Sequence, residues 1–287
     1  MNRTKPAQTV GHHRRRVIFT DLDATLLDHH DYGWGAAAPA LAELGRRNVP
    51  VCLVTSKTAA EVAALRIALD NGHPFAVENG GAVAVPEGYF DGAVCDARTP
   101  VELTTLGAGH DELRALARRL RAAYGFRFTG FGDMDTAAVA RATGLDAAAA
   151  ERARRREASE PLLWQDSADA LDHFTARVAE AGYAVRVGGR FVHVLGHADK
   201  GGALAWLRAR YAAVHGSILA IALGDSGNDA DMLAAADIGY WVARPDGSYY
   251  APAGGPIRHA PGIGPAGWAA AIDALIEGEE LPEDVHG

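Results

Sequence analysis

Two aspartates separated by one residue follow the first strongly apolar segment of the chain. Asp21 and Asp23 follow the apolar residues VIF at 17–19, with Thr20 between. Side chains alternate along an extended chain, so residues i and i+2 face the same way, and two neighbouring carboxylates repel unless a cation or a shared proton relieves them. A polar strand end that runs into a turn is the other interpretation of an isolated Asp-x-Asp pair. The remaining sequence has to decide between the two.

Two further apolar segments end in polar residues of the same kind. VCLV is followed by Thr55 and Ser56, and ILAIAL is followed by GDSGND, which contains Asp225, Asn228 and Asp229. Ligands of open α/β sheets bind beyond the carboxyl ends of the strands, so these residues are candidates for one site. Carboxylates with no His or Cys nearby in sequence favour Mg²⁺, which binds one or two carboxylates, waters and phosphate oxygens.

A phosphoryl group is the ligand that suits these residues. Lys200, in the segment DKGG, opens a predicted helix, and its ammonium group can neutralise a phosphate oxygen. Thr55, Asn228 and backbone amides can hold the other phosphate oxygens while Mg²⁺ bridges the phosphate to the protein. The predicted metal ligands are the aspartates of the two acidic segments, namely Asp21, Asp23, Asp225 and Asp229.

The hydrophobic pattern predicts the elements that position these residues. A strand at 16–20, a helix over APALAELGRRN that ends at Gly45, and the strand VPVCLVTS come first, and the helix TAAEVAALRIALDNG follows with Thr58 and Glu61 in capping-box spacing. The strand pair PFAV and GAVAV is interrupted by a turn at 79–81. From 196 onward the segments KGGALAWLRARYAAVHG, SILAIALGDS, NDADMLAAAD, IGYWVA and GWAAAIDALIEG alternate between helix and strand. This order predicts an α/β fold with a Rossmann-like, doubly wound parallel sheet.

The middle of the chain has a different character. Arginine-rich amphipathic helices alternate with the short strands PLLW, YAVRVGG and RFVHVLG, which predicts an inserted α+β cap domain. We therefore expect a core domain formed by 14–85 and 196–276, a cap domain at 86–195, a disordered tail at 1–13 and an acidic tail at 277–287.

Composition excludes several classes of protein. The 28 Lys and Arg residues are outnumbered by 36 Asp and Glu residues, and the net charge of -8 argues against a nucleic-acid-binding protein. No apolar stretch approaches the ~20 residues that cross a bilayer, so we expect no membrane association. Cys52 and Cys95 are too few for a disulfide framework, which favours a cytoplasmic protein. We expect a monomer or a homodimer.

Four motifs in order resemble the haloacid dehalogenase superfamily of phosphohydrolases: DLDAT, VTS, DKG and GDSGND. The resemblance implies that Asp21 attacks phosphorus to give an aspartyl phosphate. Asp23 would protonate the leaving alcohol and then deprotonate the hydrolytic water, while Thr55, Lys200 and Mg²⁺ would assist. Ala24 departs from the family pattern, because that position is usually glycine.

A narrower resemblance covers nearly the whole chain except the tails. The segments FTDLDATLLDHHDYGW, TSKTAAEV, PFAVENGGAV, REASEPLLW and GGRFVHVLGHADKGGA are similar to the mannosyl-3-phosphoglycerate phosphatase family, with Gly81 and Ala158 as departures. This resemblance implies hydrolysis of mannosyl- or glucosyl-3-phosphoglycerate to a glycosylglycerate, a compatible solute. Arg190 would bind the substrate carboxylate, and Glu157, Ser159 and Glu160 would bind hydroxyl groups. The predicted substrate-binding residues are Ser56, Lys57, Asn79, Glu157, Ser159, Glu160, Gly189, Arg190 and Asn228.

Other functions remain open at this point. A Cof-type or sucrose-phosphate-type sugar phosphatase would share the same core, and so would a phosphomannomutase-like phosphotransferase, which would release an isomeric sugar phosphate instead of free phosphate. A non-catalytic phosphate sensor or a receiver-like domain phosphorylated on Asp21 is a third possibility. The large predicted cap and Asp23 argue against it, because a receiver needs neither a lid nor an acid for a leaving alcohol.

Overall fold

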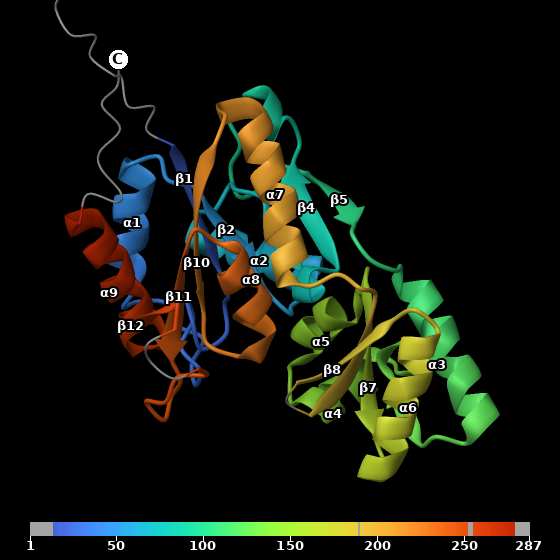
Figure 1. The fold of residues 1–287 in the computed structure, drawn as a ribbon. Coiled ribbons are helices and arrows are strands. Elements are labelled where there is room, and N and C mark those ends of the chain that lie inside the picture. Colours follow the sequence, from blue (N-terminus) through green and yellow to red (C-terminus); the bar gives the residue numbers. More distant parts are fainter. Residues whose placement is uncertain (1–13, 189, 252–254, 279–287) are drawn as a thin grey trace, which may run out of the picture.

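The computed structural model of the chain describes residues 14–188, 190–251 and 255–278. The tail predicted at 1–13, Gly189, and residues 279–287 of the predicted acidic tail lie outside these described residues. Within them, no helix is both long enough and apolar enough to cross a membrane. Figure 1 shows two packed parts, each built around its own sheet.

The larger part contains an eight-stranded sheet with the order β12-β11-β10-β1-β2-β3-β4-β5. The strands from β12 to β3 pair in parallel, whereas β3, β4 and β5 pair antiparallel to one another. The strand bounds are β1 Arg15–Thr20, β2 Val51–Val54, β3 Phe75–Val77, β4 Ala82–Pro86, β5 Val101–Thr105, β10 Ile218–Gly224, β11 Ile238–Ala243 and β12 Arg258–Ile263.

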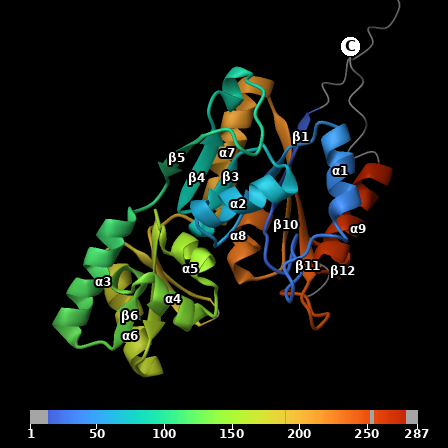
Figure 2. The same cartoon turned by 180° about the vertical axis from the view of Figure 1, so that it is seen from behind.

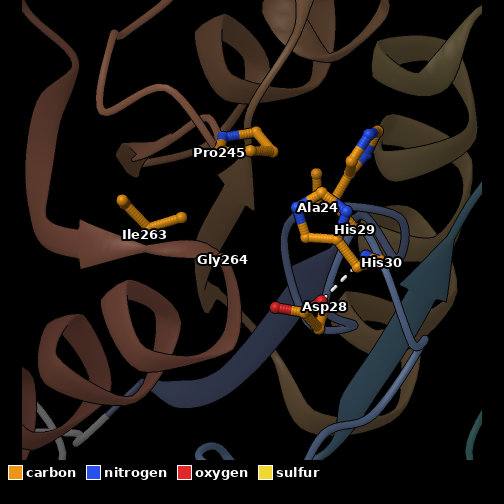
Figure 3. A pocket seen from close by; sticks show the side chains of 7 residues that line it. All are labelled: Ala24, Asp28, His29, His30, Pro245, Ile263 and Gly264. Carbon is orange, nitrogen blue, oxygen red and sulfur yellow. Dashed lines mark hydrogen bonds between the residues drawn. The ribbon is translucent and has the colours of Figure 1, made fainter.

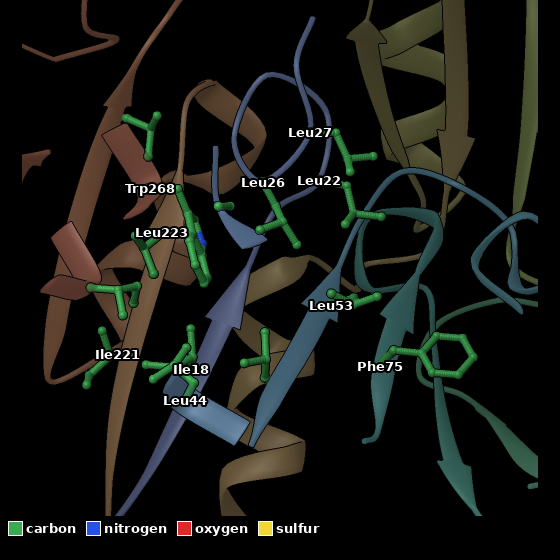
Figure 4. Close-up of a cluster of buried hydrophobic side chains, with 14 of the residues drawn as sticks. Ile18, Leu22, Leu26, Leu27, Leu44, Leu53, Phe75, Ile221, Leu223 and Trp268 are labelled. Atoms are coloured by element: carbon green, nitrogen blue, oxygen red, sulfur yellow. The ribbon is translucent and has the colours of Figure 1, made fainter. Parts of the chain in front are cut away.

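Helices cover both faces of this sheet (Figures 1 and 2). On one face, Ile18 of β1 belongs to a buried cluster with Leu44 and Trp268 from two of the helices, as Figure 4 shows. On the other face, Phe19 of β1 packs in a cluster with Leu204. Consecutive residues of β1 are apolar because the strand is buried on both of its faces. The helices of the first face are α1 Ala38–Arg46, α2 Ala59–Leu69 and α9 Gly264–Glu277, and those of the second are α7 Lys200–His215 and α8 Ala230–Ala235.

The smaller part contains a four-stranded antiparallel sheet with the order β6-β7-β9-β8. Its strands are β6 Phe128–Gly130, β7 Ser159–Trp164, β8 Ala184–Gly188 and β9 Phe191–Leu195. Helices α3 His110–Tyr124 and α6 Ala168–Glu180 pack in one cluster with Leu162. Helices α4 Thr136–Thr143 and α5 Ala147–Arg154 pack in another cluster with Leu163. The alternation of Leu162 and Leu163 matches a strand covered on both faces.

Two details differ from the sequence-based expectation. Strand β5 lies within the predicted cap segment, yet it pairs with β4, so the main sheet continues beyond the boundary predicted at 85. Helix α1 does not end at Gly45 but at Arg46, and the left-handed residue after it is Asn48, with φ of 51°. Gly45 is exposed at a helix position, where glycine is tolerated at about 1 kcal/mol relative to alanine.

Candidate active site

Neighbouring parallel strands bring the three predicted motifs to one edge of the sheet. Strand β1 lies between β10 and β2, and Thr20 is in register with both Leu223 and Leu53. The amide of Asp21 donates to the Leu223 carbonyl at 2.9 Å. The residues that follow these strands, including Thr55, therefore meet at the carboxyl edge, where ligands of such sheets bind.

A buried lysine joins two of the aspartates. Lys200 is 0% exposed, and its Nζ atom donates to Asp21 Oδ1 at 2.5 Å and to Asp229 Oδ1 at 2.6 Å. Burial alone would favour the neutral amine, but Asp21 and Asp229 hold the pKa of Lys200 above its usual value. The lysine is thus a fixed positive charge at the end of β1.

The aspartates here exceed the positive charge available to them. Burial raises the pKa of Asp21 to about 8 although Lys200 opposes it, and burial followed by the charge of Asp229 raises the pKa of Asp225 to about 6. One carboxylate oxygen from each of Asp21, Asp225 and Asp229 lies within 4.8 Å of the others. Crowded, desolvated oxygen donors of this kind fit a divalent cation such as Mg²⁺. Asp23, a predicted ligand, does not belong to this group.

Backbone amides fix the orientation of Asp229. Its Oδ2 atom accepts hydrogen bonds from the amides of Asp225 and Ser226, both at 3.0 Å. Gly224 allows this approach, because a Cβ at that position would lie 2.4 Å from the Cβ of Asp229. Gly224, the first residue of the segment GDSGND, is therefore explained by packing against Asp229.

Asp23 faces a second lysine. Both of its carboxylate oxygens lie 2.8 Å from the Nζ atom of Lys57, which is also 5.2 Å from the ring centroid of Tyr32. Burial would favour the neutral amine, but the charge of Asp23 keeps the pKa of Lys57 above its usual value. The Asp23 side chain is 38% exposed against 9% for Asp21, so it is the more accessible carboxylate of the opening pair.

Ala24 has a left-handed backbone conformation, with φ of 60°. An L-residue with a Cβ pays about 1–2 kcal/mol for this conformation, whereas glycine does not. This is the position where the resemblance led us to expect glycine. A small cavity of about 120 Å³ lies beside it. Its lining residues, drawn in Figure 3, are Ala24, Asp28, His29, His30, Pro245, Ile263 and Gly264.

The predicted phosphate-binding residues are linked through the turn at 78–80. The amide of Asn79 donates to the Thr55 carbonyl at 2.9 Å, and Asn228 Nδ2 donates to Asn79 Oδ1 at 3.0 Å. Gly80 has φ of 89°, and a Cβ there would lie 2.0 Å from the Asp199 carbonyl oxygen at the start of α7. The turn is therefore packed closely against the segment that carries Lys200.

A pocket of about 780 Å³ opens onto these residues and is bounded by both parts of the molecule. The four-stranded sheet supplies Arg186, Val187 and His193, which the sequence did not identify as site residues. Burial lowers the pKa of His193 to about 4, so its ring is neutral at pH 7. The lining residues are Asp21, Asp23, Ala24, His29, Ser56, Asn79, Arg186, Val187, His193, Asp225, Ser226, Gly227, Asn228 and Tyr250.

The segment predicted to contact sugar hydroxyls joins the two parts of the molecule. The buried carboxylate of Glu78 accepts hydrogen bonds from the amides of Glu157 at 2.7 Å and Ala158 at 3.2 Å, and also from the Ser159 hydroxyl. Glu160 is 1% exposed, and its carboxylate lies 2.7 Å from His110 Nε2. Glu157, Ser159 and Glu160 do not line the pocket as the structure stands.

Arg190 lies away from the pocket lining. Its guanidinium group donates to the carbonyls of Ala142 at 3.4 Å and Thr143 at 3.2 Å, at the end of α4. The role assigned to it from the sequence remains a prediction, as do those of Glu157, Ser159 and Glu160, and Gly189 lies outside the described residues.

Comparison with known proteins identifies the family. A family model described as sucrose-6F-phosphate phosphohydrolase matches residues 164–248. The chain is 38% identical over 270 residues to a protein of Methanococcoides burtonii named glucosyl-3-phosphoglycerate/mannosyl-3-phosphoglycerate phosphatase, an alignment that covers 91% of this chain and 97% of that protein. A protein of the same name from Persephonella marina is 38% identical over 226 residues, with 77% and 82% covered.

Solved structures agree at the level of the fold. A haloacid dehalogenase-like hydrolase from Bacteroides thetaiotaomicron superposes with a TM-score of 0.67 at 15% identity. The superposition covers 92% of this chain and 100% of that one. The length and identity of the two sequence matches carry the assignment further than the fold does. The chain belongs to the glucosyl-3-phosphoglycerate/mannosyl-3-phosphoglycerate phosphatase family, whose members are phosphoric monoester hydrolases of the haloacid dehalogenase superfamily.

Proposed function

We propose that this phosphatase hydrolyses glucosyl- or mannosyl-3-phosphoglycerate to the glycosylglycerate and inorganic phosphate through an aspartyl phosphate on Asp21. The observation that carries the proposal is the grouping of Asp21, Lys200 and Asp225 at the base of a pocket that Asp23 also lines. The names of the two relatives supply the substrate class. A glycosylglycerate product would act as a compatible solute, and with both cysteines free we place the enzyme in the cytoplasm.

In the first step, an Asp21 oxygen forms a bond to phosphorus and the bond to the glycerate oxygen breaks, while Asp23 gives its proton to that oxygen. In the second step, Asp23 takes a proton from water as the water oxygen bonds to phosphorus and the bond to Asp21 breaks. Lys57 pairs with the Asp23 carboxylate at 2.8 Å, so Asp23 must turn from this lysine and take up a proton from water before it can give one to the leaving oxygen. The substrate phosphate offers Lys57 another anionic partner at that moment.

Bound Mg²⁺ would supply charge neutralisation for the phosphoryl group and for the crowded carboxylates. Asp21, Asp225 and Asp229 are the residues that fit it, because their oxygens converge. Burial also raises the pKa of Asp21 and of Asp225, which a bound cation would offset. Lys200 holds Oδ1 of Asp21, a residue that also lines the pocket. Thr55, Ser56, Asn79 and Asn228 are the proposed phosphate-binding residues.

A sugar phosphatase of the sucrose-phosphate type is the second candidate, because the matching family model carries that description over residues 164–248. Phosphate-release assays with glucosyl- and mannosyl-3-phosphoglycerate, sucrose 6-phosphate and hexose phosphates would separate the two. We expect kcat/KM to be highest for a glycosyl-3-phosphoglycerate. A preference for sucrose 6-phosphate or for a hexose phosphate would reject the substrate assignment.

The Asp21→Asn variant is the control for the same assay. The amide is nearly isosteric but a poor nucleophile, so kcat should fall by at least about a thousandfold while the fold is retained. Activity within tenfold of the wild type would show that catalysis does not pass through Asp21. Excess chelator should also suppress wild-type activity, which would test the metal requirement directly.

A further inference from the structure

We propose that Arg186 binds the carboxylate of the glycerate group in the substrate, and that Asp231 holds the Arg186 side chain until substrate arrives. The proposal rests on the proposed function, because it concerns the second charged group of that substrate. It assigns carboxylate recognition to a residue on the edge strand of the smaller sheet.

The position of Arg186 carries the first step of the argument. Strand β8 is the edge strand of the smaller sheet, and Arg186 lies opposite His193 in its pairing with β9. Directly opposed residues of antiparallel strands project from the same face of a sheet. Both residues line the 780 Å³ pocket together with Asp21 and Asp23, so this sheet contributes to the pocket wall.

Charge carries the second step. Among the described lining residues of this pocket, Arg186 is the one lysine or arginine, whereas Asp21, Asp23 and Asp225 are acidic. A second anionic group that enters this pocket therefore needs a cation beyond those at the phosphate. Lys200 is already bonded to two aspartates and Lys57 is paired with Asp23. A guanidinium group matches a carboxylate in geometry and can form two parallel hydrogen bonds with it.

The present partner of Arg186 is easily replaced. Arg186 Nη2 lies 3.3 Å from Asp231 Oδ2 on α8, and the two side chains are 45% and 50% exposed. Exposed ion pairs of this kind contribute about 0–1 kcal/mol, so a substrate carboxylate can displace Asp231 at little expense. The pair also spans the two parts of the molecule, which keeps the guanidinium group at the mouth of the pocket.

The experiment compares Arg186→Ala and Arg186→Lys with Arg127→Ala. Arg127 is a matched control, because it is an exposed arginine of the same part of the molecule and also lies 3.3 Å from an aspartate, Asp166, outside the pocket lining. For glycosyl-3-phosphoglycerate, Arg186→Ala should lower kcat/KM by about 10- to 100-fold, the range expected when a charge-assisted pair is lost. Arg186→Lys should recover part of this loss. Arg127→Ala should stay within twofold of the wild type.

Two small phosphates that carry no sugar test carboxylate binding independently of sugar recognition. The ratio of kcat/KM for 3-phosphoglycerate to that for glycerol 3-phosphate compares two small phosphates, of which only the first has a carboxylate. Arg186→Ala should lower this ratio at least about fivefold, which supports the proposal even if the preferred sugar substrate is another one. An unchanged ratio, or equal losses on both substrates, would overturn it. A selective loss in Arg190→Ala with none in Arg186→Ala would assign the carboxylate to Arg190 instead.

Discussion

Two sets of ion pairs, each with one member in the lining of the same pocket, differ in distance and in burial. At its base, Lys200 lies 2.5 Å from Asp21 and 2.6 Å from Asp229, and the lysine and Asp229 side chains are 0% exposed. At its rim, Arg186 lies 3.3 Å from Asp231, and about half of each side chain is exposed. The first set is held in a desolvated environment, where charges interact strongly and a lone charge is costly. The second is in water, where partners exchange readily.

The difference separates the two tasks of the enzyme. Phosphoryl transfer needs groups that stay in place during reaction, and burial of Lys200 between two aspartates provides this. Substrate selection needs a group that changes its partner on binding, and an exposed arginine provides that. We therefore expect changes at the base of the pocket to alter stability as well as activity, and changes at the rim to alter selectivity alone.

The largest effect is expected for Lys200→Met. Removing the ammonium group leaves Asp21 and Asp229 buried without a cation, and we expect a loss of about 3–5 kcal/mol in the free energy of unfolding. Arg208→Met, on the same helix, is the matched change, because Arg208 pairs with Asp237 at 3.0 Å and both side chains are partly exposed. Its loss should stay below about 1 kcal/mol. Urea unfolding in the presence of chelator measures the free energy of unfolding of both variants. Similar midpoints for the two variants would contradict the contrast between buried and exposed pairs.

The second prediction uses the pH dependence of the base of the pocket. The pKa of Asp21 is raised from 3.8 to about 8 in the folded protein. Its proton is therefore held by the folded protein and released by the unfolded chain, so stability from this group is complete below pH 3.8 and falls as pH rises toward 8. Asn cannot ionise, so the stability of the Asp21→Asn variant should rise relative to that of the wild type as pH rises.

Thermal unfolding in chelator at several pH values checks this prediction. Between pH 5 and pH 8 the Tm of Asp21→Asn should rise relative to the wild type by at least about 2 °C. Mg²⁺ should then raise the Tm of the wild type at pH 8 more than that of the variant, because it neutralises the carboxylate that the variant lacks. A Tm difference that does not change with pH would show that Asp21 is ionised throughout in the folded protein.

The base of the pocket was predictable from the sequence, and the rim was not. Asp21, Thr55 and Asp225 follow apolar strands directly, and parallel neighbours bring such strand ends together. Arg186 sits in the alternating segment VRVGGR, where either arginine could face the pocket. Which one does depends on the pairing of β8 with β9 and on the packing of α4, neither of which local pattern specifies. The partner of Arg186, Asp231, is 45 residues away in the chain.

The hydrogen-bond partners of two buried polar residues were not predictable from the sequence for a related reason. The family resemblance of the segment REASEP implied contacts with sugar hydroxyls, and in the structure Ser159 bonds to Glu78 and Glu160 to His110. Their partners come from other elements, so the sequence could not show that their hydrogen bonds are already satisfied within the protein. Ala24 is different, because the departure from glycine was visible in the sequence, and the structure adds its strained φ of 60°.

The smallest expected effect is that of Asp231→Asn at the rim. If Asp231 competes with the substrate carboxylate for Arg186, removing its charge should lower KM for 3-phosphoglycerate by up to about fivefold, the worth of an exposed ion pair. KM for glycerol 3-phosphate should not change. Glu180→Gln is the matched control, because Glu180 is a similarly exposed residue that pairs with Arg177 on α6. The effect should also vanish at about 1 M salt, where charges are screened within about 3 Å. A rise in KM for 3-phosphoglycerate would mean that Asp231 orients Arg186 for the substrate and does not compete with it, so that the pair at the rim, like that at the base, is kept during turnover.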